Sequence, residues 1–260
     1  MKNLRKYGNQ PHKIAVIHGG PGASGEMRSV AEYLSSKKGI LEPLQTSHTI
    51  KGEINQLKTM LLASNKSPFI LIGFSWGAWL SLLTAANYPT LVEKVIIIGC
   101  GPLEQKYVEQ INKTRLSRLD PTEKAEFTSL LNDLKKRTKK DTNTLIKNLK
   151  NLTNKTDQYR PIDNFKEKIN FDRNIFQNIW NEAMRLRKSG ELLERIDKID
   201  CPVIAIHGTY DPHPIEGVGE PLSRILTDFR LIKLARCGHK PWNEQEARER
   251  FYNILIEELQ

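Results

Sequence analysis

A series of short apolar runs that alternate with amphipathic segments is the feature that most constrains the fold. The apolar runs cover residues 13–18, 69–74, 95–99, 203–207 and 230–234. Helical periodicity is found at 26–37, 52–64, 76–87, 217–226 and 243–259. The runs are short and almost free of polar residues, which is typical of strands buried on both faces. Strands that alternate with helices predict a parallel sheet covered by helices on both sides.

The number of strands follows from the same pattern. Residues 40–45 are a poorer strand candidate because Pro43 interrupts them. Only a dozen residues precede the first clear strand. We therefore expect about six strands, all parallel. Right-handed crossovers would place the carboxyl ends of these strands at one edge, where ligands bind in such sheets.

One interval, residues 104–190, contains no strand run and only amphipathic helical segments, most clearly 123–134 and 171–188. The chain of 260 residues is near the size limit of a single hydrophobic core. We therefore expect one core, formed by residues 1–103 and 191–260, with a helical cap inserted at 104–190.

Most of the positive charge lies in this predicted cap. The whole chain has a formal net charge of +10, and the cap holds 20 Lys and Arg against 12 Asp and Glu. One basic run consists of Lys135, Lys136, Arg137, Lys139 and Lys140. Such a run is typical of a solvated helix face. The alternative interpretation is an anionic or acyl substrate drawn toward the cap.

Composition excludes several classes of protein. No run of about 18 apolar residues could span a membrane, and the polar, basic N-terminus does not resemble a secretion signal. The three cysteines, Cys100, Cys201 and Cys237, are widely spaced and form no CxxC pair. This favours reduced cysteines in a cytoplasmic protein over a disulfide framework or a zinc site.

The strongest chemical signal is the GxSxG motif at Gly73–Gly77, between a predicted strand and a predicted helix. Glycines two positions before and after the serine allow the chain to turn sharply and pass close to its neighbours. In this context the motif resembles the nucleophile elbow of α/β hydrolases. It therefore predicts Ser75 as a nucleophile.

A serine nucleophile needs a general base, and the base an orienting acid. In α/β hydrolases these follow the serine in the order acid, then histidine. His239 follows the last strand and is predicted as the base, whereas His207 ends a strand and is expected to be packed. Asp211 follows the preceding strand and is predicted as the acid, because Asp200 and Asp228 precede strands and lie at the opposite edge.

The remaining predicted site residues lie around these three. The oxyanion would be held by the backbone N–H groups of Trp76, which follows the nucleophile, and of Gly20, in the loop after the first strand. His213 is too close to Asp211 in sequence to be bridged easily by that carboxylate. It is expected in the substrate pocket with three further residues: His18, Gly19 and Trp242.

The loop after the first strand has a second interpretation. Residues 20–25 match GxGxxG between a strand and a helix, and Glu42 lies where a ribose-binding acid would belong. This pattern is typical of dinucleotide-binding proteins. Against it, Pro21 removes an N–H from the loop that would meet the pyrophosphate, and Ser75, Asp211 and His239 would be left without a role.

Four motifs resemble the proline iminopeptidase branch of the α/β-hydrolase family: HGGPG at 18–22, GFSWG at 73–77, HGTYDP at 207–212 and CGHKPW at 237–242. The resemblance implies a serine mechanism, with residues 104–190 as the family's cap. The chain departs from the family in three ways. The short N-terminus leaves no room for the usual antiparallel hairpin, residues 41–45 lack the Asp-Gln-Arg-Gly run of the peptidases, and the cap is basic where the peptidases use carboxylates to bind an amine.

The sequence thus predicts an α/β-fold serine hydrolase that cleaves esters or small amides without a cofactor, using Ser75, His239 and Asp211. No cluster of metal ligands is apparent. Three alternatives remain: a proline iminopeptidase-type aminopeptidase, a non-catalytic or dinucleotide-binding α/β protein, and a nucleic-acid binder that uses the basic cap. The last lacks basic motifs interleaved with aromatic residues, so no nucleic-acid partner is expected. The sequence leaves the substrate and the oligomeric state open.

Overall fold

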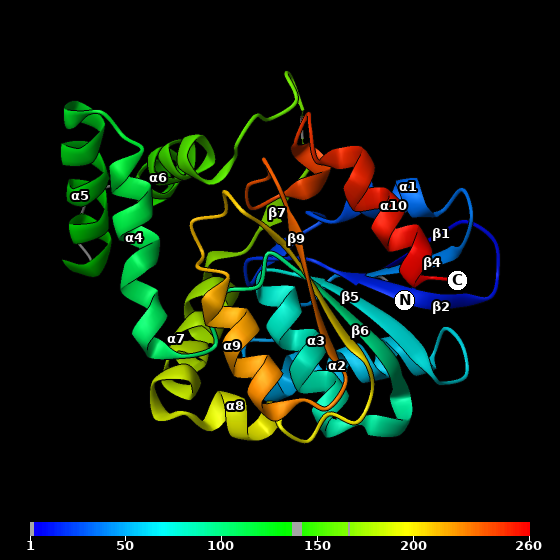
Figure 1. The fold of residues 1–260 in the computed structure, drawn as a ribbon. Coiled ribbons are helices and arrows are strands. Elements are labelled where there is room, and N and C mark those ends of the chain that lie inside the picture. Colours follow the sequence, from blue (N-terminus) through cyan, green and yellow to red (C-terminus); the bar gives the residue numbers. More distant parts are fainter. Residues whose placement is uncertain (1–2, 137–141, 166) are drawn as a thin grey trace.

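The computed structural model describes residues 3–136, 142–165 and 167–260 and is built around a seven-stranded sheet (Figure 1). The order of the strands across the sheet is β1-β4-β2-β5-β6-β8-β9, and all neighbours except β1 and β4 are parallel. The strands are β1 (Leu4–Tyr7), β2 (His12–Ile17), β4 (Gly39–Pro43), β5 (Phe69–Phe74), β6 (Val92–Ile98), β8 (Val203–Gly208) and β9 (Phe229–Leu234).

Helices cover both faces of this sheet (Figure 1). One face packs against α1 (Arg28–Leu34) and α10 (Arg248–Glu258). The other packs against α2 (Ile50–Leu62), α3 (Trp76–Asn87), α8 (Glu191–Ile196) and α9 (Glu216–Ile225). The short 3₁₀ turns η1 (Pro89–Leu91) and η3 (Pro241–Asn243) contribute buried residues to the core, whereas η2 (Gln105–Tyr107) has none and lies at the start of the insertion.

The two-sided burial explains why the strand runs are apolar throughout. In β2, Ala15 and Ile17 belong to the cluster under α2 and α3, whereas Ile14 and Val16 belong to the cluster under α1 and α10. Successive side chains point to opposite faces, and here both faces exclude water. An apolar side chain at each position of the strand therefore stabilises the fold.

The insertion between β6 and β8 is mainly helical, as predicted. It contains α4 (Val108–Ser117), α5 (Pro121–Lys136), α6 (Thr142–Asp157) and α7 (Arg173–Ser189). The first three stand away from the sheet in Figure 1 and share a small apolar cluster of their own, centred on Phe127. In contrast, α7 packs onto the main core through Ile179 and Ala183. The cap is thus part separate cluster and part extension of the core.

The prediction of six parallel strands was wrong at the N-terminus. The strand β1 pairs antiparallel with β4, with Leu4 opposite Pro43. Its sequence, LRKY, carries no apolar run because it is an edge strand held by polar contacts. Arg5 and Tyr7 both donate to the buried carboxylate of Glu42, at 3.1 and 2.6 Å. Pro43 is the last residue of β4, where the ring does not interrupt the ladder.

The other predicted strands and core helices are present, with shifts of a few residues at most ends. The helices α4 and α6 were not singled out in the sequence. A two-stranded ladder of β3 (Ala23–Ser24) and β7 (Asn170–Phe171), which ties the cap to the loop after β2, was not predicted either. In the basic run, Arg137, Lys139 and Lys140 lie outside the described residues, and Lys135 and Lys136 belong to α5.

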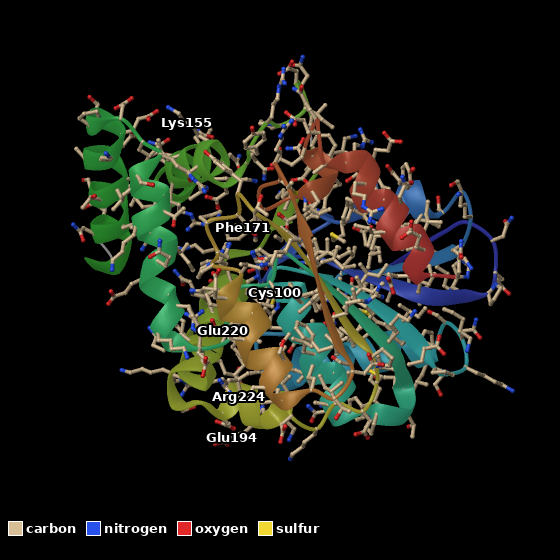
Figure 2. All side chains as sticks on the ribbon, viewed as in Figure 1. Cys100, Lys155, Phe171, Glu194, Glu220 and Arg224 are labelled. Atoms are coloured by element: carbon tan, nitrogen blue, oxygen red, sulfur yellow. The ribbon has the colours of Figure 1, made fainter. Side chains whose placement is uncertain are left out.

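None of the helices that the structure describes is long and apolar enough to cross a membrane. All three cysteines are free, and two are buried, including Cys100 just after β6 (Figure 2). Burial raises the pKa of the Cys201 thiol to about 11, and raises the pKa of Cys100 and Cys237 as well. At neutral pH these groups are thiols rather than reactive thiolates.

The packing of α7 on the core makes a testable prediction. Ile179→Ala should lower the free energy of unfolding by about 2–4 kcal/mol, since Ile179 is fully buried and its truncation leaves a cavity. Met184→Ala on the same helix is the control, because Met184 is 45% exposed, and should change it by less than about 0.5 kcal/mol. Urea denaturation measures both. Equal effects of the two changes would contradict the anchoring role of α7.

Candidate active site

Ser75 occupies a strained turn between β5 and α3. Its φ of 51° and ψ of −110° lie in a region that residues with a side chain rarely adopt. A methyl group on Gly73 would come within 2.2 Å of the carbonyl oxygen of Gly77. One on Gly77 would come within 2.3 Å of the carbonyl oxygen of Ile17. Both glycines are therefore needed for the chain to make this turn against the end of β2.

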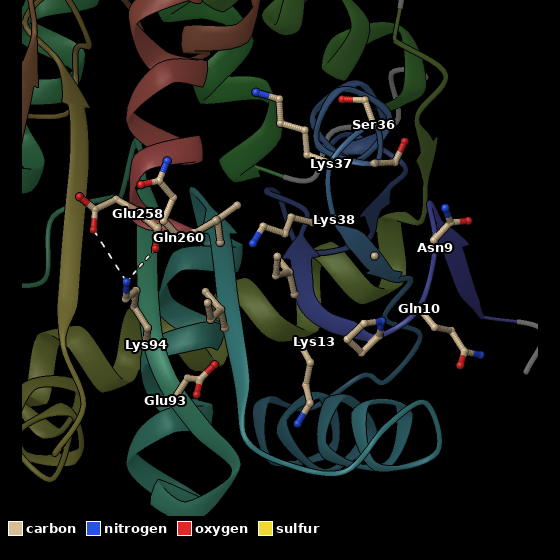
Figure 3. A pocket seen from close by; sticks show the side chains of 16 residues that line it. Asn9, Gln10, Lys13, Ser36, Lys37, Lys38, Glu93, Lys94, Glu258 and Gln260 are labelled. Carbon is tan, nitrogen blue, oxygen red and sulfur yellow. Dashed lines mark hydrogen bonds and ion pairs between the residues drawn. The ribbon is translucent and has the colours of Figure 1, made fainter.

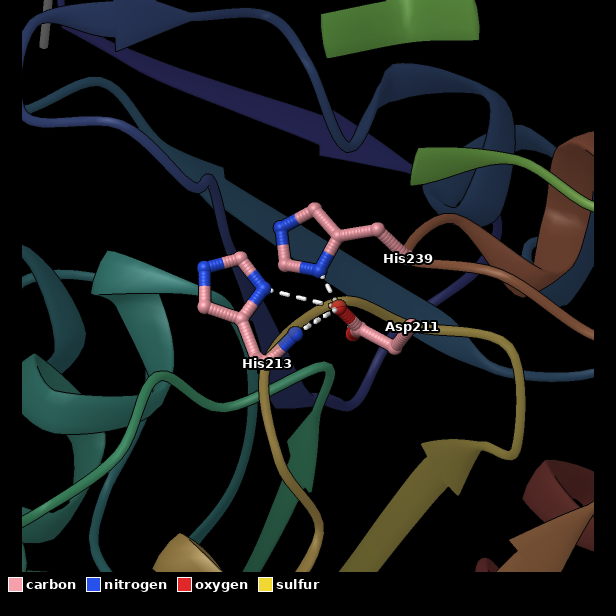
Figure 4. Close-up of side chains that lie close together, drawn as sticks. All are labelled: Asp211, His213 and His239. Carbon is pink, nitrogen blue, oxygen red and sulfur yellow. Dashed lines mark hydrogen bonds and ion pairs between the residues drawn. The ribbon is translucent and has the colours of Figure 1, made fainter. Parts of the chain in front are cut away.

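Asp211 and His239 meet at the same edge of the sheet (Figure 4). Asp211 follows β8 and is fully buried at its side chain, and its Oδ2 lies 2.7 Å from Nδ1 of His239, in the loop after β9. The ring of His239 packs against Phe74, the residue before Ser75, with 4.8 Å between ring centroids. The acid, the histidine and the serine turn therefore converge, although Ser75 lies more than 130 residues before the other two in sequence.

The prediction that His213 is too close in sequence to be bridged by Asp211 was wrong. Oδ1 of Asp211 accepts both the backbone N–H of His213, at 2.9 Å, and its ring Nδ1, at 2.7 Å (Figure 4). An aspartate readily bonds the backbone two residues on, in an Asx turn, and this turn also brings the imidazole back to the carboxylate. The packed histidine His207 supports the same turn, with its Nε2 2.9 Å from the carbonyl oxygen of His213.

The charges of the three groups are set by burial and by one another. Burial alone would raise the pKa of Asp211, but His239 and His213 together hold it well below its usual value. Burial alone would lower the pKa of His239, but the Asp211 carboxylate outweighs it and raises that pKa above the usual 6.5. For His213 burial prevails, and its pKa is lowered. With Nδ1 of His239 facing the carboxylate, Nε2 is the nitrogen left to exchange a proton.

Trp76 is fixed by a neutral acid. Its ring Nε1 donates to Oε2 of Glu53, at 2.9 Å, from the buried face of α2. Burial, with a smaller contribution from Glu182, raises the pKa of Glu53 to about 8, so this carboxyl is protonated at neutral pH. The backbone N–H of Trp76 is the first of α3, and the first N–H groups of a helix have no partner within it.

A cavity of about 260 Å³ opens beside Ser75, at the carboxyl edge of the sheet. It is lined by Ser75, Trp76, Trp79, Gly101, Pro102, Val108, Ile111, Asn112, Arg115, Trp180, Arg187 and His213. The loop after β6, α4 and α7 thus close it on the cap side. Of the four residues predicted in the substrate pocket, His213 is among the lining.

The other three predicted pocket residues lie elsewhere. His18 and Gly19 are buried at the end of β2, and Trp242 is fully buried. Trp242 packs edge-on against Phe74, with 4.7 Å between centroids, and its Nε1 donates to Glu167 at 3.1 Å. Trp242 thus packs beside the residue that precedes Ser75, and none of the three is among the residues that line the cavity.

A group of cap residues that no sequence pattern indicated holds the His239 loop. The backbone N–H of His239 donates to the carbonyl oxygen of Asp157, at the end of α6, at 2.7 Å. The Asp157 carboxylate in turn binds Arg115 of α4 through two bonds, of 2.9 and 2.6 Å. Lys240, the residue after His239, pairs with Glu26 of the core and with Glu167 of the cap. Such partners come from distant parts of the chain, so only the fold reveals them.

The glycine loop at 20–25 is paired with residues of the cap. Ala23 and Ser24 pair with Phe171 and Asn170, and the N–H of Asp172 donates to the carbonyl oxygen of Gly22 at 2.8 Å. A helix begins only at Arg28. Glu42, the acid of the dinucleotide pattern, is bound to β1. The loop therefore has a structural role that accounts for several of its glycines.

One cluster of side chains that could bind a metal ion occurs among the described residues. Asp211, His213 and His239 offer three ligand atoms within 4.8 Å of one another. However, both imidazole Nδ1 atoms lie 2.7 Å from carboxylate oxygens, a hydrogen-bond distance. Ligands 2.0–2.1 Å from one tetrahedral zinc ion would be about 3.3 Å apart. The spacing fits proton sharing better than metal binding.

A larger hollow lies at the opposite edge of the sheet (Figure 3). Its volume is about 620 Å³, and it is lined by the first residues of several strands, including Lys13, Gly39 and Lys94. Lys94 binds the C-terminal end of α10 there. Ser75, Asp211 and His239 all follow the carboxyl ends of strands, so this hollow is remote from them. The smaller cavity is the one that is lined by Ser75 and His213.

Residues 46–241 match the model of the α/β hydrolase fold family, and the chain belongs to this family. It is similar to ethanol acetyltransferase 1 of Cyberlindnera fabianii, with 28% identity over 208 residues, which cover 77% of this chain and 57% of that protein. Ethanol acetyltransferase 1 of Cyberlindnera jadinii is 33% identical over 146 residues, 51% of this chain and 42% of that protein. The chain thus spans about half the length of these curated relatives.

Solved structures agree on the fold. VinJ superposes with a TM-score of 0.73 at 18% identity, and covers 98% of this chain and 93% of that one. A proline iminopeptidase of Mycobacterium smegmatis superposes with a TM-score of 0.66 at 13% identity, with 98% and 93% covered. At such identities the likeness supports the fold alone.

The pKa of His239 predicts an acid limb in the pH profile. If His239 is the base, as the sequence predicts, it must be neutral to accept a proton, so kcat/KM should fall as the pH drops through a pKa above 6.5. Asp211→Asn should lower kcat by about four orders of magnitude. It should also move the limb to lower pH, because burial then acts on His239 without the carboxylate. Asp228→Asn, the same change at the exposed opposite edge, is the control. A limb that stays in place in Asp211→Asn would contradict the pairing.

Proposed function

We propose that this chain is a serine hydrolase that cleaves small esters through an acyl-enzyme, with Ser75 as nucleophile, His239 as general base and Asp211 as the orienting acid. The observation that carries the proposal is the 2.7 Å contact between Asp211 and His239, placed against the strained turn of Ser75. Strain at a residue with a side chain is costly and persists mainly where function requires it. Belonging to the α/β hydrolase fold family supports the same assignment.

The reaction would run in two halves. Oγ of Ser75 attacks the substrate carbonyl while Nε2 of His239 takes the hydroxyl proton. The tetrahedral intermediate collapses, its C–O bond to the leaving group breaks, and the leaving oxygen receives that proton. A water molecule then gives a proton to His239 as it attacks the acyl-enzyme, and collapse returns the proton to Ser75. Asp211 stabilises the imidazolium in both halves.

The oxyanion would be held by two backbone N–H groups, of Trp76 and Gly20. Trp76 supports this role because its N–H is the first of α3 and has no partner within that helix. Gly20 supports it because it is partly open: a methyl group there would approach only Ala23, at 3.3 Å. One such donor is worth about 3–4 kcal/mol in related reactions.

A second candidate is acyl transfer to an alcohol. It differs only in the last step, where an alcohol rather than water attacks the acyl-enzyme. The observation in its favour is that the curated relatives are named ethanol acetyltransferases. The aminopeptidase interpretation has less support, because the lining of the cavity carries Arg115 and Arg187 and, among the described residues, no carboxylate to hold an amine.

Labelling by a fluorophosphonate probe tests the nucleophile. The wild-type protein should be labelled, and Ser75→Ala should not, because the probe phosphonylates only an activated serine. Ser36→Ala, an exposed serine at the other end of the sheet, is the matched control and should be labelled like the wild type. Absence of labelling in a folded wild-type protein would overturn the proposal.

Product analysis separates hydrolysis from alcohol transfer. With 4-nitrophenyl acetate in water that contains ethanol, hydrolysis should yield acetate, with ethyl acetate no higher than the mole ratio of ethanol to water. The physical reason is that a site without an alcohol subsite captures either nucleophile by its concentration. Gas chromatography of ethyl acetate gives the partition. A large excess of ethyl acetate would replace hydrolysis by the second candidate.

A further inference from the structure

Arg187 is a buried cation that has no counterion among the described residues. It lies on α7, is 5% exposed and lines the same cavity as Ser75. Its Nη1 donates to the carbonyl oxygen of Pro102 at a long 3.4 Å, and its Nε has no hydrogen-bond partner. The guanidinium lies over the ring of Trp79, 5.4 Å from the centroid. Within the part of the chain that the structure describes, it forms no ion pair.

The other cation of the cavity differs in this respect. Arg115 also lines it, but both of its bonds to Asp157 are short, and that carboxylate neutralises it. The remaining described lining residues are apolar or uncharged, with His213 neutral because its pKa is lowered by burial. The cavity therefore carries about one positive charge, at Arg187, that none of the described residues compensates.

An uncompensated buried charge is costly. Removal of an ion from water costs several kcal/mol even after the protein relaxes. Burial is the one influence on the pKa of Arg187, which it lowers to about 10, so the group is still charged at neutral pH. Stability alone would favour an apolar side chain or a nearby acid at this position. An anionic ligand that binds in the cavity and pairs with the guanidinium would explain the presence of Arg187.

We propose that the substrate carries a carboxylate that binds the guanidinium of Arg187 while its ester carbonyl lies at Ser75, an inference that rests on the proposed hydrolase function. The guanidinium can form two parallel bonds to a carboxylate, which fixes orientation as well as adding affinity. Trp76, Trp79, Ile111 and Trp180 line the space around the charged group and suit an apolar connecting chain.

Charge and volume narrow the class further. A single uncompensated cation matches a monoanion, whereas a phosphate monoester dianion would leave one negative charge buried without a partner. The cavity of about 260 Å³ is below the range of about 300–1,000 Å³ that is usual for ligand sites. The substrate class is therefore a small carboxylic acid that carries an ester group, such as the half-ester of a short dicarboxylic acid.

Two pairs of substrates test this inference, one with the charge on each side of the scissile bond. The first is the monomethyl ester of adipic acid and the corresponding carboxamide. The second is 4-acetoxybenzoate and 4-acetoxybenzamide. In each pair a carboxylate is exchanged for a neutral group of the same shape, so the ratio of the two kcat/KM values isolates the charge.

The wild-type enzyme should prefer the carboxylate in at least one pair by about tenfold or more, the size of a charge-assisted hydrogen bond. Arg187→Gln should reduce that ratio to about one. Arg185→Gln removes the same charge from an exposed position on the same helix and should keep the wild-type ratio. A wild-type ratio near one in both pairs, or an unchanged ratio in Arg187→Gln, would overturn the inference.

A measurement on the wild type alone covers the case in which Arg187→Gln does not fold, as judged by circular dichroism. Hexanoate should inhibit hydrolysis of an uncharged ester competitively, with an inhibition constant at least about tenfold below that of hexanamide. Equal inhibition by the two compounds would overturn the inference. Labelling of Ser75 by the fluorophosphonate distinguishes this failure from a failure of the hydrolase proposal, because labelling needs no carboxylate.

Discussion

The candidate active site of this molecule depends on one buried carboxylate, that of Glu244. It is fully buried just after the loop of His239 and accepts three backbone N–H groups. Oε1 accepts from Gly238 and Tyr159, at 2.7 and 2.8 Å, and Oε2 accepts from Arg160 at 2.7 Å. Two of these donors belong to the cap and one to the core. Loss of the carboxylate would leave buried N–H groups unpaired, at about 1–3 kcal/mol each.

Because of this clamp, the cap and the predicted base are held together as one unit. The N–H of His239 is bonded to the carbonyl oxygen of Asp157, and a methyl group on Gly238 would come within 2.1 Å of that same oxygen. Asp157 also fixes Arg115, which lines the cavity. The chain that leaves α6 therefore positions the base through its backbone and the cavity wall through its side chain. A shift of the cap would move both.

Local patterns predicted most of the fold, and they also predicted which side chains would meet at one edge of the sheet. The run before Ser75 and the helix after it are recognisable because each has a clear period, and the glycines of the motif mark the turn. Asp211 and His239 follow from the rule that parallel strands present their carboxyl ends at one edge. The structure brings these two together and places them beside the turn of Ser75.

What the sequence missed depends on contacts between distant segments. The strand β1 forms because Arg5 and Tyr7 reach Glu42, a polar interaction that no hydrophobic period reveals. The contact of His213 with Asp211 depends on a turn conformation, and the position of Trp242 beneath the site depends on packing. Sequence spacing alone treated all three as independent of their partners.

For the positive charge of the chain, too, the position of a charged residue matters more than the net charge. A net charge of +10 raises the local concentration of any anion near the surface, and salt screens this effect over about 8–10 Å. Exposed cations such as Lys155, paired with Glu123 on the outer cap (Figure 2), contribute to it and distinguish no ligand. Arg187 differs because it is buried away from water and pairs with no acid in the part of the chain that the structure describes. At such a position a carboxylate ligand forms a buried ion pair with the guanidinium, whereas its neutral analogue forms none. A single residue can therefore set a preference for anionic ligands that the net charge of the chain cannot set.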